Sequence, residues 1–213
     1  MKVLPNKKFV YSICVSGAAE GPTVKTAAEL AKRLGVAIAE SGNTLLSGAT
    51  VGLPYFAAYA ATQAGGKSIG FSPAVSLREH LRKYRLPYNC FDFINFTGMN
   101  YVGRDLYLVQ SSDAVITVGG RFGSLHEFTS ALEAKKPCGV LLGSGGTADL
   151  IPELMRKLDA PRRDLVVFSD NPEDLVNKII SILDNANKDI QEQLERYDEY
   201  WFLDSESGHQ HKG

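Results

Sequence analysis

The fold of this chain follows most directly from one stretch, Asp113-Ala114-Val115-Ile116-Thr117-Val118-Gly119-Gly120-Arg121-Phe122-Gly123-Ser124-Leu125-His126-Glu127. Its apolar, β-branched first part predicts a short strand that is buried on both faces. From Phe122 a helical pattern extends to Lys135, and the glycines between the two elements predict a tight turn. Such a turn leaves backbone N–H groups unpaired at the positive end of the helix dipole. The stretch therefore predicts an anion site, above all for phosphate, between a strand and a helix.

On both sides of this stretch, short apolar runs alternate with longer helical patterns. The expected strands are residues 9–15, 44–46, 68–71, 91–95, 114–118, 138–142 and 165–168. The expected helices are residues 23–41, 53–64, 101–111, 122–135, 150–158 and 172–183. This alternation predicts a three-layer Rossmann-like α/β fold, with a mostly parallel sheet and helices on both faces.

No internal repeat or long linker interrupts the pattern, so we expect a single domain over residues 1–213. Ile190, Leu194, Tyr197 and Trp201 are spaced on one stripe, which predicts a final amphipathic helix at about 186–201. We expect this helix to pack on the surface of its own domain rather than on another subunit. The tail at about 205–213 has the composition of a frayed terminus.

The composition excludes several classes of protein. The 213 residues are 44% hydrophobic and 22% charged, with a formal net charge of -1, which disfavours duplex nucleic acid and membrane surfaces as partners. No apolar run approaches the ~20 residues that a bilayer span requires. The N-terminus lacks a signal-peptide pattern, and the three cysteines fit buried free thiols in a reducing compartment. We therefore expect a soluble, cytoplasmic protein.

Three small-residue turns fall at the same edge of the expected sheet. They are Ser16-Gly17-Ala18-Ala19-Glu20-Gly21, Ser47-Gly48-Ala49-Thr50-Val51-Gly52 and residues 119–127. Ligands of parallel sheets sit outside the carboxyl ends of the strands, so three such turns imply a ligand that the backbone approaches closely. The candidate phosphate- or nucleotide-binding residues are Ser16, Gly17, Gly48, Gly52, Gly119, Gly120, Arg121, Gly123 and Ser124.

The class of ligand follows by exclusion. The first turn lacks the G-x-G-x-x-G spacing of dinucleotide-binding folds, and no acidic residue follows Leu46 to grip a ribose. The nearest P-loop lookalike, residues 61–68, has alanine in place of the first glycine and runs from a helix into a strand. A mononucleotide or sugar phosphate remains, and we expect neither a cofactor nor a metal. Glu127, one helical turn past the phosphate site, would add acid–base chemistry.

Three segments together resemble the LOG family, once mislabelled as lysine decarboxylases. They are Gly103-Arg104, Ser112-Asp113-Ala114 and residues 119–127, and the resemblance covers about 9–142. The family lies in a Rossmann-like nucleotide-binding group that includes the DNA-processing protein DprA. Its hallmark is P-G-G-x-G-T-x-x-E, preceded by an arginine in M-H-x-R-K. Aligned without gaps, the hallmark's glutamate, threonine and earlier arginine fall on Glu127, Ser124 and Arg104.

This chain departs from the hallmark at several positions. The proline and the second glycine are Gly119 and Arg121, and the lysine after the arginine is Asp105. The methionine and histidine before the arginine are Tyr101 and Val102. Cleavage of cytokinin nucleotides is associated with the stricter motif and does not follow for this chain.

The resemblance implies hydrolysis of the N-glycosidic bond of a nucleoside 5′-monophosphate to free base and ribose 5-phosphate. Glu127 would stabilise the ribosyl cation and orient water, and Arg104 would hold Glu127 or grip the phosphate. The resemblance also implies a homodimer or higher homo-oligomer. The alternative is a non-catalytic nucleotide-binding, sensing or cofactor-carrier module, because the side chain of Arg121 would crowd a ribose. Lysine decarboxylation is rejected, since no lysine lies at the glycine-rich edge to hold pyridoxal phosphate.

Two further features allow more than one interpretation. Residues 76–88 are basic and aromatic, which fits a phosphate lid, a patch for single-stranded nucleic acid or, as we expect, the solvated face of a short helix. In that helix Leu77, Leu81 and Tyr84 would point inward. His126 is interpreted as a surface or packing residue.

Overall fold

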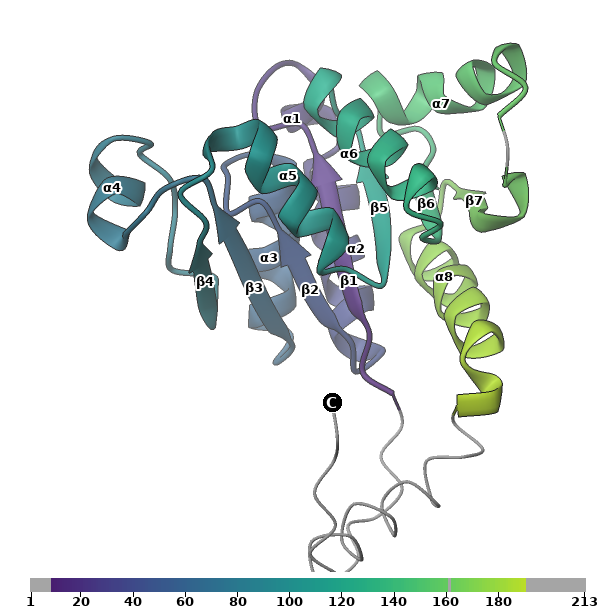
Figure 1. The fold of residues 1–213 in the computed structure, drawn as a ribbon, viewed down its shortest axis with the longest axis horizontal. Coiled ribbons are helices and arrows are strands. Elements are labelled where there is room, and N and C mark those ends of the chain that lie inside the picture. Colours follow the sequence, from purple (N-terminus) through teal and green to yellow (C-terminus); the bar gives the residue numbers. More distant parts are fainter. Residues whose placement is uncertain (1–8, 161, 191–213) are drawn as a thin grey trace, which may run out of the picture.

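The computed structural model describes residues 9–160 and 162–190. Its strands are β1 (Ser12–Gly17), β2 (Thr44–Ser47), β3 (Lys67–Ser72), β4 (Phe93–Phe96), β5 (Ala114–Val118), β6 (Cys138–Leu141) and β7 (Val166–Ser169). They form one seven-stranded sheet in the order β4-β3-β2-β1-β5-β6-β7 (Figure 1). Every neighbouring pair in the sheet is parallel, which confirms the expected α/β class.

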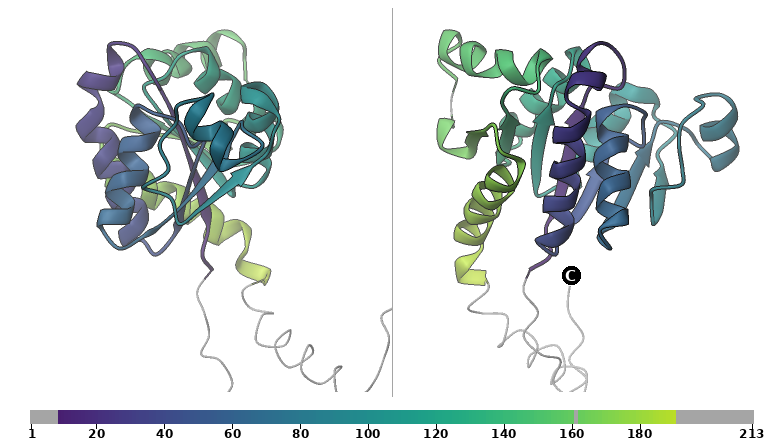
Figure 2. Two further views of the ribbon diagram at one scale, coloured as in Figure 1. Left: turned by 90° about the vertical axis from the view of Figure 1, so that its left-hand side faces the viewer. Right: turned by 180° about the vertical axis from the view of Figure 1, so that it is seen from behind.

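The helices cover both faces of this sheet. They are α1 (Thr23–Thr26), α2 (Ala28–Glu40), α3 (Leu53–Gln63), α4 (Leu77–Arg82), α5 (Asn100–Gln110), α6 (Phe122–Glu133), α7 (Gly146–Lys157) and α8 (Pro172–Ala186), with a short 3-10 helix at Arg163–Leu165. Helices α2, α3 and α8 lie on one face, and α5 and α6 lie on the other (Figures 1 and 2). Helix α4 stands off the β4 edge of the sheet. The three layers therefore match the sequence expectation.

Two apolar cores explain why the central strands are apolar throughout. On β5, Ile116 packs into the core beneath α2, α3 and α8, whereas Val115 packs into the core beneath α5, α6 and α7. Ile13 and Cys14 of β1 divide between the two cores in the same way. Successive side chains of a strand point to opposite faces, so a strand covered on both sides has no polar face.

The order of the strands creates a switch point between β1 and β5. From β1 the chain builds outward through β2, β3 and β4, then returns to place β5 on the other side of β1. The register pairs Gly17 with Val118, so the two strands end level with each other. Helices that follow β1 and β5 diverge at such a point, and a crevice opens outside the strand ends.

Some local expectations differ from the structure. The helix expected over 23–41 divides into α1 and α2 at Ala27, whose backbone (φ -104°, ψ 6°) is not helical. Helix α7 begins at Gly146, four residues before the expected helix, because two carbonyls of the 119–120 turn accept hydrogen bonds from its first turn. Helix α8 ends at Ala186. The final helix expected at 186–201 lies mostly outside the described residues, and the tail at 205–213 lies wholly outside them.

The expectation that Leu77 and Leu81 point inward is wrong. Leu77 is 45% exposed and Leu81 is 39% exposed, whereas His80 is fully buried. Its ring nitrogens lie 2.8 Å from Ser72 Oγ and 2.9 Å from Pro87 O, so hydrogen bonding rather than apolar burial anchors α4. A six-residue helix beyond the sheet edge has no apolar surface on which to bury a leucine stripe.

Two expectations from composition can be compared directly with the structure. Cys14, Cys90 and Cys138 are buried, free thiols. Burial raises the pKa of Cys90 and of Cys138 to about 12, so neither thiol has the character of a nucleophile. Within residues 9–160 and 162–190, no helix has the length and apolar character that a bilayer span demands.

Candidate functional site

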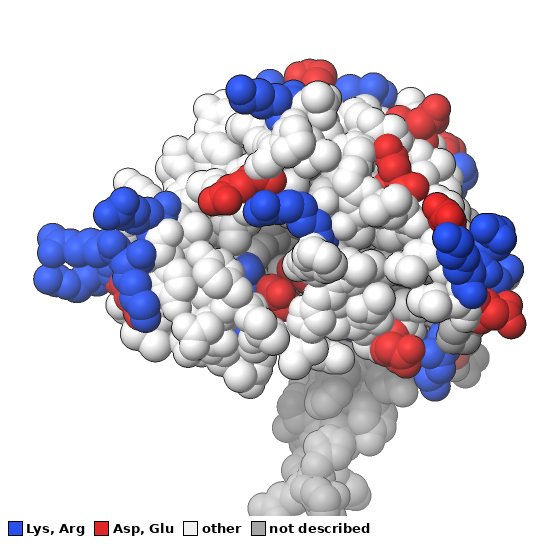
Figure 3. Space-filling model, turned by 90° about the horizontal axis from the view of Figure 1, so that it is seen from above, with Lys and Arg blue, Asp and Glu red and all other residues white. Residues whose placement is uncertain are grey.

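A cleft of about 240 Å³ opens at the carboxyl ends of β1 and β2, between the first turns of α5 and α6. Figure 3 views the molecule from this edge and shows a hollow near its centre with acidic and basic atoms inside. The lining residues are Val15, Ser16, Gly17, Ala18, Ala19, Gly48, Thr50, Pro54, Tyr101, Arg104, Asp105, Arg121, Gly123, Ser124 and Glu127. The cleft thus lies at the switch point and joins the three glycine turns expected from the sequence.

The N-terminus of α6 reaches the cleft without a side-chain cap. Its N-cap residue, Arg121, has extended backbone and provides no capping hydrogen bond. No hydrogen bond ties the N–H groups of Phe122, Gly123 and Ser124 to another residue that the structure describes. Gly123 and Ser124 both line the cleft. Free N–H groups at the positive end of a twelve-residue helix form an anion site.

The turn before α6 is held in place from behind by the loop that follows β6. Ser144 Oγ accepts a 2.7 Å hydrogen bond from the N–H of Gly119 and donates to Leu141 O. The N–H of Thr147, in the first turn of α7, donates to Gly120 O over 3.1 Å. Both carbonyls of the turn and the N–H of Gly119 are therefore bonded to the β6–α7 loop and α7, which fixes the turn from which α6 begins.

Sequence reasoning missed this supporting loop. Gly143-Ser144-Gly145-Gly146-Thr147 is a fourth glycine-rich turn between a strand and a helix, which was the available signal. Asp149 closes the turn by accepting hydrogen bonds from the N–H groups of Gly143 (2.8 Å) and Gly145 (3.1 Å). None of these residues lines the cleft, so their role is to position the turn that does.

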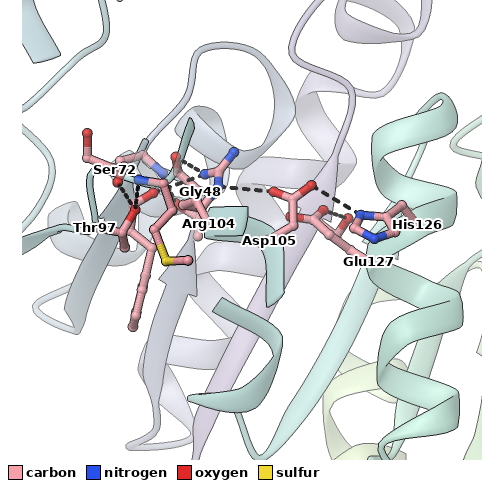
Figure 4. Close-up of polar contacts among 12 residues, drawn as sticks. Gly48, Ser72, Thr97, Arg104, Asp105, His126 and Glu127 are labelled. Carbon is pink, nitrogen blue, oxygen red and sulfur yellow. Dashed lines mark hydrogen bonds and ion pairs between the residues drawn. The ribbon is translucent and has the colours of Figure 1, made fainter. Parts of the chain in front are cut away.

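Two carboxyl groups meet at the centre of the cleft. Glu127 of α6 is 9% exposed and Asp105 of α5 is 8% exposed. Ser16 Oγ donates a short hydrogen bond to Glu127, and the Asp105 carboxyl lies beside that of Glu127 (Figure 4). Burial and the charge of Asp105 raise the pKa of Glu127 to about 7, although Arg104 and Ser16 act in the opposite direction. Asp105 was not among the expected site residues, because nothing in the sequence pairs it with Glu127.

Arg104 is buried beside this pair and bonds to the ends of two strands. Its Nη1 donates to Gly48 O, at a short distance, and to Phe71 O at 3.0 Å. Its Nε lies 3.0 Å from Asp105 Oδ1, an ion pair without hydrogen-bond alignment. The described residues include no hydrogen bond or ion pair between Arg104 and Glu127. A Cβ on Gly48 would lie 1.8 Å from Nη1, so a larger residue here would displace the guanidinium from its hydrogen bonds.

The remaining expected site residues divide into two groups. Ser16, Gly17, Gly48, Arg121, Gly123 and Ser124 line the cleft, whereas Gly52, Gly119 and Gly120 do not. Gly52 (φ +80°) allows α3 to approach the first turn, where a Cβ would lie 2.3 Å from Ala18 O. The side chain of Arg121 is 63% exposed, and its Nη2 lies 3.7 Å from a carboxylate oxygen of Glu20 at the cleft rim.

His126 is half-exposed and flanks the carboxyl pair. Its Nδ1 lies 3.4 Å from Asp105 Oδ2, on the side of Asp105 away from Arg104 (Figure 4). Within the described ranges, no three His, Cys, Asp or Glu side chains gather in a way that would hold a metal ion. The polar groups of the cleft are two carboxyls, the buried guanidinium of Arg104, the exposed guanidinium of Arg121, the hydroxyls of two serines, Thr50 and Tyr101, and the helix N–H groups.

Comparisons with known proteins agree with this architecture. The model of the SLOG cluster4 family matches residues 10–176, which include the whole cleft. An uncharacterised protein of Archaeoglobus fulgidus is 34% identical over 110 residues, a match that spans 50% of this chain and 65% of that protein. A molybdenum cofactor binding protein from Rippkaea orientalis superposes with a TM-score of 0.68 at 29% identity, over 83% of this chain and 99% of that one.

The DNA processing protein A of Helicobacter pylori shares the fold alone. It superposes with a TM-score of 0.56 at 19% identity, over 80% of each chain. Together the comparisons confirm the Rossmann-like group expected from the sequence, while membership of the LOG family itself stays a prediction.

Proposed function

The chain belongs to the SLOG cluster4 family, and from this membership and the cleft we propose that it is a binding module for a phosphorylated, nucleotide-like ligand. The observation that carries the proposal is the uncapped N-terminus of α6, whose free N–H groups open into the cleft. The β6–α7 loop already holds the turn in position, so the ligand does not have to order it.

The relative from Rippkaea orientalis supports a carrier role for the same cleft. That protein is described as binding the molybdenum cofactor, and this chain covers 99% of it. We therefore include phosphorylated cofactors beside nucleoside monophosphates as ligands. Both would place a phosphate on the α6 N-terminus, with the phosphate dianion near Ser124 and Gly123.

Calorimetric titration of the purified protein tests this proposal. The panel consists of nucleoside 5′-monophosphates, the matching nucleosides, ribose 5-phosphate and inorganic phosphate. We expect the monophosphates and ribose 5-phosphate to bind and the nucleosides to bind at least tenfold more weakly, because they lack the group that the helix N-terminus holds. Equal affinity for a nucleoside and its monophosphate would contradict the proposal.

A second candidate function is hydrolysis of the N-glycosidic bond of the bound nucleotide. It is favoured by the position of Glu127, which is buried in the cleft, hydrogen-bonded to Ser16 and has a pKa near neutrality. Such a group accepts and returns a proton at physiological pH. Arg104 would act on the reaction by lowering the pKa of Glu127 and by positioning Asp105, rather than by direct contact with Glu127.

Product analysis distinguishes the binding module from the hydrolase. Each nucleotide that binds is incubated with the wild type and with Glu127→Gln, which keeps the shape and removes the charge. Release of free base and ribose 5-phosphate by the wild type, lost in the variant, would establish hydrolysis. Binding without release from any ligand would leave the carrier role.

We also propose that two copies associate through the outer surface of α5. This surface exposes Val102 (70%), Leu106 (49%) and Tyr107 (52%), and Phe122 (89%) is exposed at the start of α6. A groove of about 430 Å³ runs along it, between the C-terminal halves of α5 and α6. Several large exposed apolar side chains beside an open groove favour a contact surface. Sedimentation velocity should show a dimer that Leu106→Glu dissociates, and a monomeric wild type would contradict the proposal.

A further inference from the structure

Tyr101 forms the one aromatic wall of the cleft. It lies in the first turn of α5, is 45% exposed and has no aromatic companion among the other lining residues. The carboxyls, serine hydroxyls and helix N–H groups account for recognition of a phosphate and a sugar. They leave Tyr101 without a role, because an exposed aromatic ring adds nothing to the binding of a small hydrated anion.

The ring of Tyr101 is held in a fixed position by Tyr84, which lies outside the cleft, and by Arg104, which lines it. The ring of Tyr84 packs against it edge to face, with centroids 5.6 Å apart and an interplanar angle of 87°. The hydroxyl of Tyr84 donates a 2.7 Å hydrogen bond to Asn100 Oδ1, next to Tyr101 in the chain. Arg104 Cζ lies 5.7 Å from the Tyr101 centroid and adds a cation–π contact. An aromatic side chain fixed in this way loses little conformational entropy when a ligand covers it.

These contacts also give a role to the basic segment 76–88. Tyr84 belongs to this segment, whose charged side chains Arg78, Arg82, Lys83 and Arg85 are exposed. Helix α4 of this segment stands off the β4 edge of the sheet (Figure 1), where Figure 3 shows a basic projection away from the central hollow, and no residue of the segment lines the cleft. The segment therefore does not close over the cleft as a phosphate lid. Through Tyr84 it supports the aromatic wall instead.

The aromatic wall and the anion site come from different helices on two sides of the cleft. The first turn of α6 follows β5, whereas α5 begins above β2 and β3, where Arg104 bonds to Gly48 O and Phe71 O. Strand β1 lies between them. A ligand that contacts both sides therefore carries a phosphate for the α6 N-terminus and a flat surface for Tyr101.

We propose that Tyr101 is the specificity-determining residue of this cleft and that the ligand carries a planar heterocycle, which lies against its ring. This inference rests on the proposed function and sharpens it, because it excludes simple sugar phosphates as the preferred ligands. Base–aromatic stacking tolerates different heterocycles, since each presents a π-face. The polar groups near Tyr101 therefore discriminate one heterocycle from another. Tyr101 itself discriminates ligands that carry a planar ring from ligands that carry none.

The test compares two ligands that differ only in the ring. Calorimetry measures Kd for ribose 5-phosphate and for the tightest-binding nucleoside 5′-monophosphate, with the wild type, Tyr101→Ala and Tyr101→Phe. In Tyr101→Ala we expect the monophosphate to bind roughly 5- to 150-fold more weakly, the range known for loss of one stacked base. Ribose 5-phosphate should bind within about twofold of the wild type, and Tyr101→Phe should restore the monophosphate.

Tyr59→Ala is the matched control. Tyr59 is 43% exposed and also packs on another tyrosine, Tyr55, with centroids 6.0 Å apart, but it does not line the cleft. This variant should leave both ligands unaffected. Tyr84→Leu removes the ring that supports Tyr101 but does not change Tyr101 itself. This variant should weaken binding of the monophosphate and leave binding of ribose 5-phosphate unchanged.

The outcomes separate this inference from the proposed function. Equal weakening of both ligands in Tyr101→Ala, or no weakening of either, would overturn the aromatic subsite while the phosphate site stands. Failure of every phosphorylated ligand to bind the wild type would overturn the proposed function and this inference with it. Selective loss of the ring-bearing ligand supports both.

Discussion

Asp105 and Glu127, from neighbouring helices, place two carboxyl groups side by side at the centre of one cleft. Both are buried, so the second negative charge forms in a poorly solvated position beside the first. Like charges at this separation cannot both ionise easily, and the pair retains a proton well above the usual range of a carboxyl group. The cleft therefore changes its charge close to neutral pH, which bears on its stability and on its ligands.

The first prediction concerns stability and pH in Glu127→Gln. The pKa of Glu127 rises from its ordinary 4.5 to about 7 on folding, so the folded state binds more protons than the unfolded state between these values. The free energy of unfolding therefore falls as pH rises through this window, by about 3 kcal/mol at most. Glutamine removes this dependence, so the variant should gain stability relative to the wild type between pH 5 and pH 8.

Urea denaturation at both pH values measures this gain. Glu153→Gln, which replaces an exposed acid, provides the control. Its free energy of unfolding should differ from that of the wild type by the same amount at pH 5 and at pH 8. A constant difference between Glu127→Gln and the wild type would show that Glu127 is already ionised at pH 5.

The second prediction concerns the partner of Glu127. Asp105→Asn removes the charge that, after burial, contributes most to the raised pKa of Glu127. The pH window over which stability falls should therefore move to lower pH, because the remaining carboxyl ionises more easily beside Arg104. The same denaturation series, sampled at intervals from pH 4 to pH 9, locates the window. An unchanged window would mean that burial alone sets this pKa.

The third prediction separates binding from stability at Gly123. A Cβ at this position meets no protein atom within 4 Å, and the residue lies in the first turn of α6. Gly123→Ala should therefore stabilise the helix by up to about 1 kcal/mol. The added methyl would enter the cleft beside the N–H groups, so phosphate-bearing ligands should bind more weakly. Thermal denaturation and calorimetry of one preparation test both effects.

Gly48→Ala is the contrasting variant, because its Cβ would displace the guanidinium of Arg104. It should lose stability as well as binding. A loss of stability in Gly123→Ala, as in Gly48→Ala, would contradict the open space at Gly123. Unchanged binding of phosphate-bearing ligands by Gly123→Ala would show that the ligand does not occupy this space.

The fourth prediction concerns the support behind the anion site. Ser144→Ala leaves the N–H of Gly119 and the carbonyl of Leu141 without their hydroxyl partner, in a position that is 1% exposed. An unsatisfied buried donor costs about 1–3 kcal/mol, so the melting temperature should fall by several degrees. Ligand affinity should fall as well, although Ser144 does not line the cleft. Replacement of the exposed Ser111 by alanine should change neither quantity.

The sequence predicted the framework well because hydrophobic periodicity and glycine turns are local signals. The stretch from Asp113 to Glu127 is an example, since its strand, its turn and its helix all occur where expected. The expected turns at Gly17 and Gly48 also reach the cleft. Parallel topology then brings turns that are distant in the sequence to one edge, without any knowledge of side-chain contacts.

What the sequence could not predict depends on how the helices pack against one another. The contact between Asp105 and Glu127 requires the separation and rotation of α5 and α6, which no local pattern encodes. The same holds for His80, whose hydrogen bonds replaced the expected apolar anchoring of α4. Arg104 was expected to meet Glu127 or a phosphate, but the carbonyls at the ends of β2 and β3 accept its hydrogen bonds.

The hydrogen bonds from the β6–α7 loop to the turn before α6 have a consequence for the order of events during synthesis. Every residue that lines the cleft lies between Val15 and Glu127, so a nascent chain released as far as Lys135 contains the complete lining. That chain still lacks Ser144 and the N–H groups of Thr147 and Ala148, which fix the turn. Since chains fold as they emerge, we expect ligand capture only after α7 has left the ribosome. The nascent chain would thus bind ligand only after the β6–α7 loop and α7 have been synthesised, although neither contributes a residue to the cleft lining.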